Sequence, residues 1–399
     1  MSLNYKNGEL YFEDQAKLSE IIEENEGRAC YVYHLGNIKK RFQVLKDSLS
    51  GLNALSIHYA VKANANSEVL KTMRELGASV DIVSGGEMDI ALQNGFESSD
   101  VIFSGVAKTK NEILKAISKE IKQINVESTQ ELSRIGELAK KEGKKISIAL
   151  RMNPEVSPET HPYITTGMSE NKFGMDRSFI PELVRILKQY PDNLNLRGLT
   201  MHIGSQLLEL DVVDEAIQKL LSIYHELEVL GFPMESIDIG GGVGIHYSHG
   251  DEEKDYKIIK KYGDIVTQSL KNFKGEVIIE PGRVLVGRSG VLLCQIEYIK
   301  ETNYKNFAIV NTGMHHLMRP ALYQANHRIL SLKEKEGVQK KSYDVVGPIC
   351  ESSDFIGKNR TFLELEQGDY LAICDAGAYG FAMANNYNAH DFPKEIIIS

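Results

Sequence analysis

The stretch SIHYAVKANAN (residues 56–66) begins as an apolar, β-favouring run and ends in a lysine followed by small and polar residues. This pattern predicts a strand near 56–61 with Lys62 at its C-terminal end. Because an ammonium group is costly to bury without a partner, the simplest interpretation is a surface lysine at the end of a strand. A desolvated lysine can instead lose its proton and bond covalently to an aldehyde cofactor. The rest of the chain decides between the two.

Strand-like runs recur beyond this stretch and alternate with amphipathic segments of helical spacing. The expected strands are 56–61, 79–83, 100–104, 123–127, 146–151, 197–203, 236–240 and 276–280. The expected helices are 67–76, 86–94, 110–120, 129–142, 178–190, 211–230 and 255–273. Strands and helices alternating in this way over about 230 residues predict an α/β fold with a parallel (β/α)8 TIM-like barrel. An open doubly wound sheet has the same alternation and stays an alternative.

The alternation stops near residue 284, and the segments beyond it read as strands separated by turns. These expected strands are 284–299, 306–312, 342–347, 361–366 and 369–375. At the N-terminus we expect a strand at 9–12, a helix near 14–26, a strand at 29–35 and a helix at 36–50. The predicted organisation is a cofactor-binding barrel over residues 30–283 and a mainly β domain formed by 1–29 and 284–399.

One connection inside the barrel is unusually long, the Pro- and Gly-rich segment 153–175. Loops of this length in a compact domain usually have a function, and this one follows the C-terminal end of an expected strand. Barrel enzymes keep their active sites at that end of their strands. We therefore expect 153–175 to belong to the active-site face.

Composition excludes several classes of protein. The chain has 399 residues, 42% of them hydrophobic and 25% charged, which is typical of a globular enzyme. A net charge of −9 argues against a nucleic-acid partner. No apolar run approaches the roughly 20 residues that a membrane span requires, and no secretory signal is visible. The four cysteines have no metal-type spacing. We expect a cytoplasmic enzyme without a metal or a membrane partner.

Four features with chemical potential fall at the ends of expected strands: Lys62, His202, the run Gly240–Gly242 and Glu280. Taken singly, the histidine is most simply a core residue, the glycines a flexible turn and the glutamate a cap. In a barrel, however, the C-terminal ends of all strands meet at one mouth. Their joint position therefore favours a single site.

These residue types match what pyridoxal 5'-phosphate requires. Lys62 supplies the amine for the aldehyde, and Glu280 supplies a carboxylate that keeps the ring nitrogen protonated. Glycines let backbone N–H groups approach the phosphate closely, and a flat ring such as that of His202 can stack on the cofactor. The remaining candidates for the phosphate site are Ser205, Gly241, Gly242, Gly282 and Arg283.

The motifs YAVKAN, HIGSQ, DIGGGVGI, EPGR, MRPALY, GPICES and DAGAYGFAMANNYN occur in this order along the chain. With THPYITTG and ENKFGM they resemble the diaminopimelate decarboxylase family, over residues 6 to 388. That family belongs to the alanine racemase-like enzymes, which combine a barrel with a β domain. The resemblance implies conversion of meso-2,6-diaminopimelate to L-lysine and carbon dioxide, the last step of lysine biosynthesis, with pyridoxal 5'-phosphate as cofactor. It also implies a homodimer with shared active sites.

The resemblance further implies a role for each matching residue. Lys62 would bond the cofactor covalently, His202 would lie against its ring, and Glu280 would pair with its nitrogen. Cys350 would lie over the reacting carbon, and Tyr379 near the phosphate and the substrate. The residues implied to bind the far end of the substrate are Arg283, Arg319 and Tyr323 for its carboxylate and Glu351 for its ammonium. In this family Cys350 and Glu351 come from the partner subunit.

The chain departs from the family pattern at two places. Ser353 stands where the family more often has glycine, which changes the backbone freedom near Cys350. The tail after Asn388 begins with Ala389 and His390 and lacks the arginines that the family often carries there. Any contact made by those arginines is therefore in doubt.

Three other functions stay open at this point. A decarboxylase of a basic amino acid, including a D-ornithine or D-lysine type, would leave Arg319 without a substrate carboxylate. An alanine racemase-like enzyme would place an arginine, not Glu280, beside the ring nitrogen. A non-catalytic barrel that only carries the cofactor would not need Lys62, Cys350 and Glu351 together.

Overall fold

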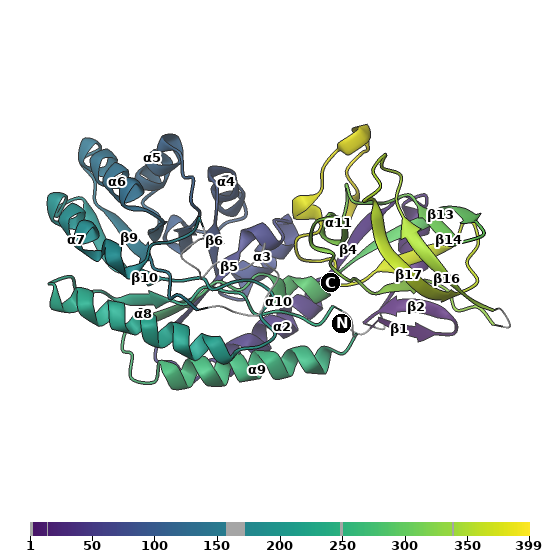
Figure 1. The fold of residues 1–399 in the computed structure, drawn as a ribbon, viewed down its shortest axis with the longest axis horizontal. Coiled ribbons are helices and arrows are strands. Elements are labelled where there is room, and N and C mark those ends of the chain that lie inside the picture. The colour runs from purple at the N-terminus through teal and green to yellow at the C-terminus, as the bar shows by residue number, and fades with distance from the viewer. Residues whose placement is uncertain (1–2, 14, 157–171, 248–249, 337–338) are drawn as a thin grey trace. The chain divides into compact units, whose positions relative to one another are not determined.

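The computed structural model describes residues 3–13, 15–156, 172–247, 250–336 and 339–399. The chain divides into two compact units, each built from separate segments (Figure 1). The barrel unit contains Phe42–Gly244 and Tyr256–Gly282. The β-rich unit contains Met1–Arg41, Ile245–Asp255 and Arg283–Ser399.

The barrel unit holds a closed parallel barrel with the strand order β10-β11-β12-β5-β6-β7-β8-β9. Its strands are β5 (Leu55–Ala60), β6 (Ser79–Ile82), β7 (Val101–Phe103), β8 (Gln123–Val126), β9 (Ile146–Arg151), β10 (Leu194–Thr200), β11 (Ser236–Asp238) and β12 (Glu276–Ile279). Closure is visible in β5, which pairs with β6 on one side and with β12 on the other. The predicted (β/α)8 fold class is confirmed, and the open sheet is excluded.

Helices follow the barrel strands and lie outside them (Figure 1). They are α3 (Ser67–Glu75), α4 (Gly85–Gln93), α5 (Lys110–Lys119), α6 (Thr129–Lys141), α7 (Ile180–Gln189), α8 (Asp211–Val229) and α9 (Glu252–Ser269), with α2 (Leu35–Ser48) preceding β5. Several begin at a capping side chain: Ser84, Thr109 and Ser128 each accept a hydrogen bond from the backbone three residues on. Such caps fix where a helix starts and so set the length of each strand-to-helix loop.

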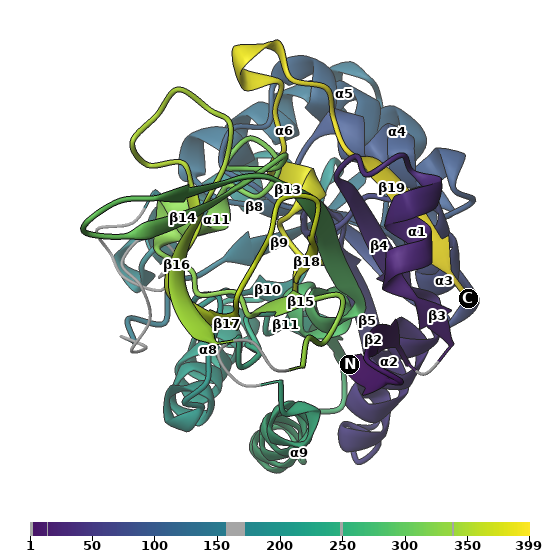
Figure 2. The same cartoon turned by 90° about the vertical axis from the view of Figure 1, so that its right-hand side faces the viewer.

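The large sheet of the β-rich unit is organised around one long strand, β13 (Gly290–Glu301) (Figure 2). β13 is antiparallel to β4, β14 and β18, while β19 runs parallel to β4. The other strands of the sheet are β4 (Cys30–His34), β14 (Asn306–Val310), β15 (Ile329–Ser331), β16 (Lys340–Val346), β17 (Phe355–Leu363), β18 (Tyr370–Ile373) and β19 (Lys394–Ile398). A small sheet of β1 (Leu3–Lys6), β2 (Glu9–Phe12) and β3 (Ala16–Lys17) and the helix α1 (Leu18–Glu24) complete the N-terminal part.

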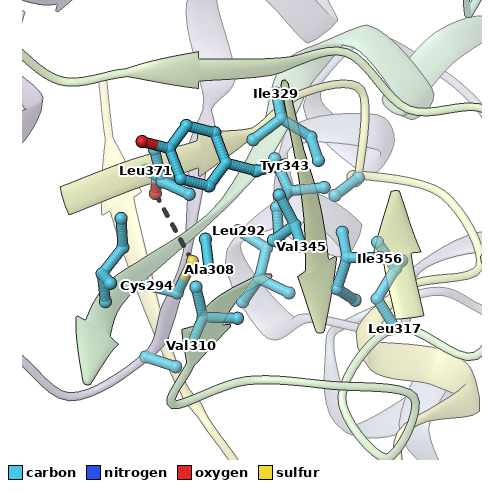
Figure 3. Close-up of a cluster of buried hydrophobic side chains, with 14 of the residues drawn as sticks. Leu292, Cys294, Ala308, Val310, Leu317, Ile329, Tyr343, Val345, Ile356 and Leu371 are labelled. Atoms are coloured by element: carbon cyan, nitrogen blue, oxygen red, sulfur yellow. Dashed lines mark hydrogen bonds between the residues drawn. The ribbon is translucent and has the colours of Figure 1, made fainter. Parts of the chain in front are cut away.

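Alternate residues of these strands form an apolar core inside the β-rich unit (Figure 3). Leu292, Cys294 and Ile296 of β13 point into it together with Val345 of β16 and Leu371 of β18. The period-two spacing on β13 is what a strand with one buried face requires. The thiol of Cys294 donates to the carbonyl of Leu371 at 3.8 Å, so this cysteine serves as a small core residue.

The sequence prediction was wrong at the start of β13, because residues 284–289 are helical. They form α10 (Arg283–Val286) and a 3-10 turn at Gly287–Ser289. Arg288 explains the break in the strand: it is 1% exposed and donates to Asp255 at 2.7 Å and to Asp375 at 3.2 Å. A buried guanidinium needs such partners, and an apolar pattern cannot reveal them.

Other boundaries also differ from expectation. β17 begins at Phe355 rather than near 361, and β15, β19 and the short helix α11 (Arg319–Tyr323) were not predicted. Residues 30–41, assigned to the barrel from sequence, group with the β-rich unit, in which β4 pairs with β13 and β19. Residues 245–255 and Arg283 group with that unit as well. Residues 157–171 of the long loop lie outside the described part of the chain. No helix in the described part is long and apolar enough to cross a membrane.

Candidate active site

The barrel unit contains a cavity of about 560 Å³ whose lining includes Lys62, His202 and Glu280. Lys62 lies in the 3-10 turn Val61–Ala63 directly after β5. His202 and Glu280 lie one or two residues beyond the ends of β10 and β12. Three of the residues singled out from sequence are therefore brought together, although they are far apart along the chain.

A buried carboxylate holds the amine of Lys62. The Nζ atom lies 2.9 Å from Oδ2 of Asp81, a residue of β6 that is 0% exposed. The other carboxylate oxygen of Asp81 has no hydrogen-bond partner among the described residues. Asp81 thus fixes the position of the lysine amine and keeps a free acceptor in the site. Asp81 was not predicted from the sequence.

Glu280 belongs to a cluster of buried acids. Its carboxyl group accepts a hydrogen bond from Nδ2 of Asn125 at 3.3 Å. Burial raises its pKa well above the usual value, and the neighbouring carboxyls of Asp238 and Asp81 raise it further. Burial also raises the pKa of Asp238, to about 6. A group of buried acids is stabilised by a positive charge placed beside it, such as a protonated ring nitrogen.

The turn Gly240–Gly242 approaches its neighbours more closely than any side chain would allow. A Cβ on Gly241 would lie 2.1 Å from the carbonyl oxygen of Glu280, and a Cβ on Gly242 2.3 Å from that of Gly204. Gly242 also has a φ of +107°, in the region that favours glycine. The turn therefore packs bare backbone against the loops that follow β10 and β12, which contain Ser205 and Gly282. Such a cradle fits a phosphate group.

His202 is held as a neutral ring. Burial lowers its pKa well below the usual value, and the positive charges of Arg151 and Lys62 lower it further. Its Nδ1 atom accepts a hydrogen bond from the backbone N–H of Gly241 at 3.3 Å. The ring is therefore tied to the glycine turn in one tautomer, with the proton on Nε2. A flat neutral ring beside Lys62 can stack on a cofactor ring.

The β-rich unit contains a second cluster of candidate residues, built around two arginines. Arg283 donates to the hydroxyl of Tyr247 at 2.7 Å, and its guanidinium lies 4.8 Å from the ring centre of Tyr379. The guanidinium of Arg319, the first residue of α11, lies 4.3 Å from the ring centre of Tyr247. Tyr323, the last residue of α11, is partly exposed.

Both guanidiniums of this cluster are mostly buried. Among the described residues no carboxylate is paired with Arg319, and burial lowers the pKa of its guanidinium. Buried cations packed on aromatic rings are suited to receive an anionic group, because arginine binds carboxylates through two parallel hydrogen bonds. Tyr247 contacts both arginines, and it was not predicted from the sequence.

Cys350 and Glu351 lie on an exposed loop of the β-rich unit. The tail of the chain holds this loop: Asn388 accepts from the backbone N–H of Cys350 at 3.1 Å, and Tyr387 donates to Glu351 at 2.6 Å. Asp354 holds its other side by accepting from the backbone of Met314 and Ile349. Cys350 thus differs from Cys30, Cys294 and Cys374, which are buried.

The departures from the family pattern have mild structural consequences. Ser353 is absent from the described residues with positive φ, so a serine causes no backbone strain there. Ala389 has a φ of +60°, and the ring centre of His390 lies 4.8 Å from that of His315. The tail thus makes its contacts through its tyrosine, asparagine and histidine side chains.

A lysine, a buried carboxylate and a glycine turn at the mouth of a (β/α)8 barrel define a class of pyridoxal-phosphate enzymes. Residues 35–287 match the family of the pyridoxal-dependent decarboxylases, by their pyridoxal binding domain. The diaminopimelate decarboxylase of Aquifex aeolicus is 41% identical, over 99% of this chain and 92% of that relative. The diaminopimelate decarboxylase of Pseudomonas fluorescens is 42% identical, over 100% of this chain and 93% of that relative.

A solved structure gives the same result. The crystal structure of diaminopimelate decarboxylase from Helicobacter pylori complexed with L-lysine has a TM-score of 0.89 and 37% identity to this chain. The match covers 96% of this chain and 94% of that one. This chain belongs to the diaminopimelate decarboxylase family, and its cofactor is pyridoxal phosphate.

Proposed function

We propose that this chain decarboxylates meso-2,6-diaminopimelate to L-lysine and carbon dioxide, the last step of lysine biosynthesis. The observation that carries the proposal is the buried pair Arg283 and Arg319 with their tyrosines. Diaminopimelate carries an amino-acid group at each end, so its non-reacting end offers a carboxylate to these arginines. Ornithine has no such carboxylate and would leave the two cations without a ligand.

The residues of the barrel unit fit the cofactor in four respects. Lys62, positioned by Asp81, forms the covalent attachment, and Glu280 holds the proton on the ring nitrogen. His202 packs flat against the ring. The phosphate is bound by the turn at Gly241 and Gly242 together with Ser205 and Gly282. We also assign Arg283 and Tyr379, which belong to the β-rich unit, to the phosphate. When bound, pyridoxal phosphate withdraws electron density from the α-carbon as carbon dioxide leaves.

The remaining residues bind the substrate. Arg283, Arg319 and Tyr323 take the far carboxylate, with Tyr379 beside them, and Glu351 takes the far ammonium. Cys350 lies over the reacting carbon. We further propose that Cys350 and Glu351 act in the active site of a partner subunit, in a cytoplasmic homodimer. Their exposure on a loop held by Asn388 and Tyr387 supports this assignment.

Incubation with meso-diaminopimelate tests the function. Lysine and carbon dioxide should form in equal amounts, and the Lys62→Ala variant should form neither. Ornithine, arginine and D-lysine serve as competing substrates. Faster release of carbon dioxide from ornithine or D-lysine than from diaminopimelate would contradict the proposal.

The purified holoenzyme is expected to be yellow, with an absorbance that borohydride removes by fixing the cofactor to Lys62. The reason is the position of the Lys62 amine, held 2.9 Å from Asp81 in the barrel cavity. Peptide mass spectrometry locates the label. A label on Lys108, a buried lysine that is already bonded to Glu131 and two backbone carbonyls, would refute the assignment.

A further inference from the structure

A buried histidine lies directly behind Arg319. His327 is 0% exposed, and its Nε2 atom lies 2.6 Å from Nη1 of Arg319. Since a guanidinium can only donate, Nε2 must be the acceptor and carry no proton. The other ring nitrogen, Nδ1, lies 2.8 Å from the carbonyl oxygen of Cys374 and must be its donor. The two contacts together define one neutral tautomer.

The support of His327 is rigid. The backbone N–H of Cys374 donates to the carbonyl of Arg328 at 2.8 Å, next to the ladder in which Ile329 of β15 pairs with Ile373 of β18. The ring of Tyr247 packs edge-on against the ring of His327, with centres 5.0 Å apart. The sheet therefore fixes the direction of the Nε2 lone pair, and that lone pair fixes the rotation of the Arg319 guanidinium.

A neutral acceptor suits a binding site better than an acidic one. A carboxylate in this position would orient Arg319 but would also neutralise it. The imidazole leaves the positive charge available to a ligand. Burial and the charge of Arg319 lower the pKa of His327 well below its usual value, in agreement with the neutral tautomer that its two contacts define.

We propose that His327 is a positioning residue that aims Arg319 and thereby sets the preference for substrates with a far carboxylate. The inference rests on the proposed function, because that function assigns Arg319 to the far carboxylate. Groups that orient metal ligands from behind typically change metal affinity or activity by about 10–100-fold when they are lost, and we expect an effect of the same order for Arg319.

Binding of two amines to the holoenzyme tests this inference without relying on turnover. L-lysine carries the far carboxylate, whereas cadaverine has the same length and lacks it. The dissociation constant of each is measured from the change in cofactor absorbance. We expect His327→Phe to raise the dissociation constant of L-lysine by about 10–100-fold and that of cadaverine by less than about twofold. His327→Gln, whose amide oxygen can still accept from Arg319, should recover most of the affinity.

A double-mutant cycle shows whether His327 acts through Arg319. In an Arg319→Lys background, His327→Phe should have no further effect on the preference for L-lysine over cadaverine. His34→Phe is the matched control, since His34 is a buried histidine of the same unit that bonds Asn37 rather than an arginine. It should leave both dissociation constants unchanged.

Each other outcome overturns the inference. An equal loss of affinity for both amines in His327→Phe would mean a general structural defect. An unchanged ratio of the two dissociation constants would mean that His327 has no role in aiming Arg319. If His327→Phe does not fold, the cycle is run with His327→Asn, whose shorter side chain does not reach Arg319, and additivity with Arg319→Lys overturns the inference. A wild-type enzyme with no preference for L-lysine would instead contradict the proposed function itself.

Discussion

Glu280→Gln enzyme is expected to retain pyridoxal phosphate but to decarboxylate about 10²–10³-fold more slowly than the wild type. An amide cannot hold a proton on the ring nitrogen, and the cofactor then draws electrons from the α-carbon less effectively. The effect should appear in kcat rather than in cofactor content, because Lys62 and the glycine turn are unchanged. Single-turnover release of carbon dioxide and cofactor absorbance measure the two quantities separately.

Glu276→Gln is the matched control for this experiment. Glu276 lies at the opposite end of the same strand, β12, and pairs with Lys122 at 2.7 Å and with Arg197 at 3.0 Å. Its loss should affect stability and leave kcat unchanged. A Glu280→Gln enzyme within twofold of the wild type would show that Glu280 is not the partner of the ring nitrogen.

Mixing two inactive variants, Lys62→Ala and Glu351→Ala, is expected to restore activity if the active sites are shared between subunits. In a mixed dimer, one site carries both defects, and the other takes Lys62 from one chain and Glu351 from its partner. With equal mixing and random pairing about half of the dimers are mixed, so roughly a quarter of all sites should recover. Activity per cofactor, measured after subunit exchange, gives this fraction.

The matched control for the mixing experiment is the pair Lys62→Ala and Glu280→Gln. Both of these residues line the same barrel cavity, so their defects fall in one chain's own site and mixing should restore nothing. If size analysis shows exchanged heterodimers and the Glu351→Ala mixture still stays at the level of the single variants, then Glu351 acts within its own chain. The proposal of shared sites would then fail.

The barrel was predictable because each of its strands is a short apolar run followed by a helix with a polar start. Caps such as Ser84 and Thr109 mark the transitions, and the sequence patterns therefore carry the boundaries. In the β-rich unit the sequence patterns say less about where helices and strands begin and end. The apolar run Val284–Val286 fits a helix as well as a strand, and only the buried partners of Arg288 show which one forms.

The site was predictable where a polar residue or a glycine run ends an apolar strand in the sequence. Lys62, His202, Glu280 and the glycine turn interrupt or end apolar strands. Asp81 and Asp238 were missed because they sit inside such strands, in the words SVDI and SID. A carboxylate in a buried strand of a barrel is itself a signal, since it must find a partner in the interior. His327 gave no comparable signal, because its contact with Arg319 depends on the β15–β18 ladder.

The pairing of β4 with β19 has a consequence for how the chain folds during synthesis. Cys30 pairs with Lys394, whereas every barrel strand has been made once Ile279 has left the ribosome. The sheet of the β-rich unit therefore keeps an open edge at β4 until β19 emerges. Contacts between such distant segments form slowly, and an unpaired edge strand can pair with other chains in the meantime. Chaperones that shield this edge would thus matter most in the interval between synthesis of β13 and synthesis of β19.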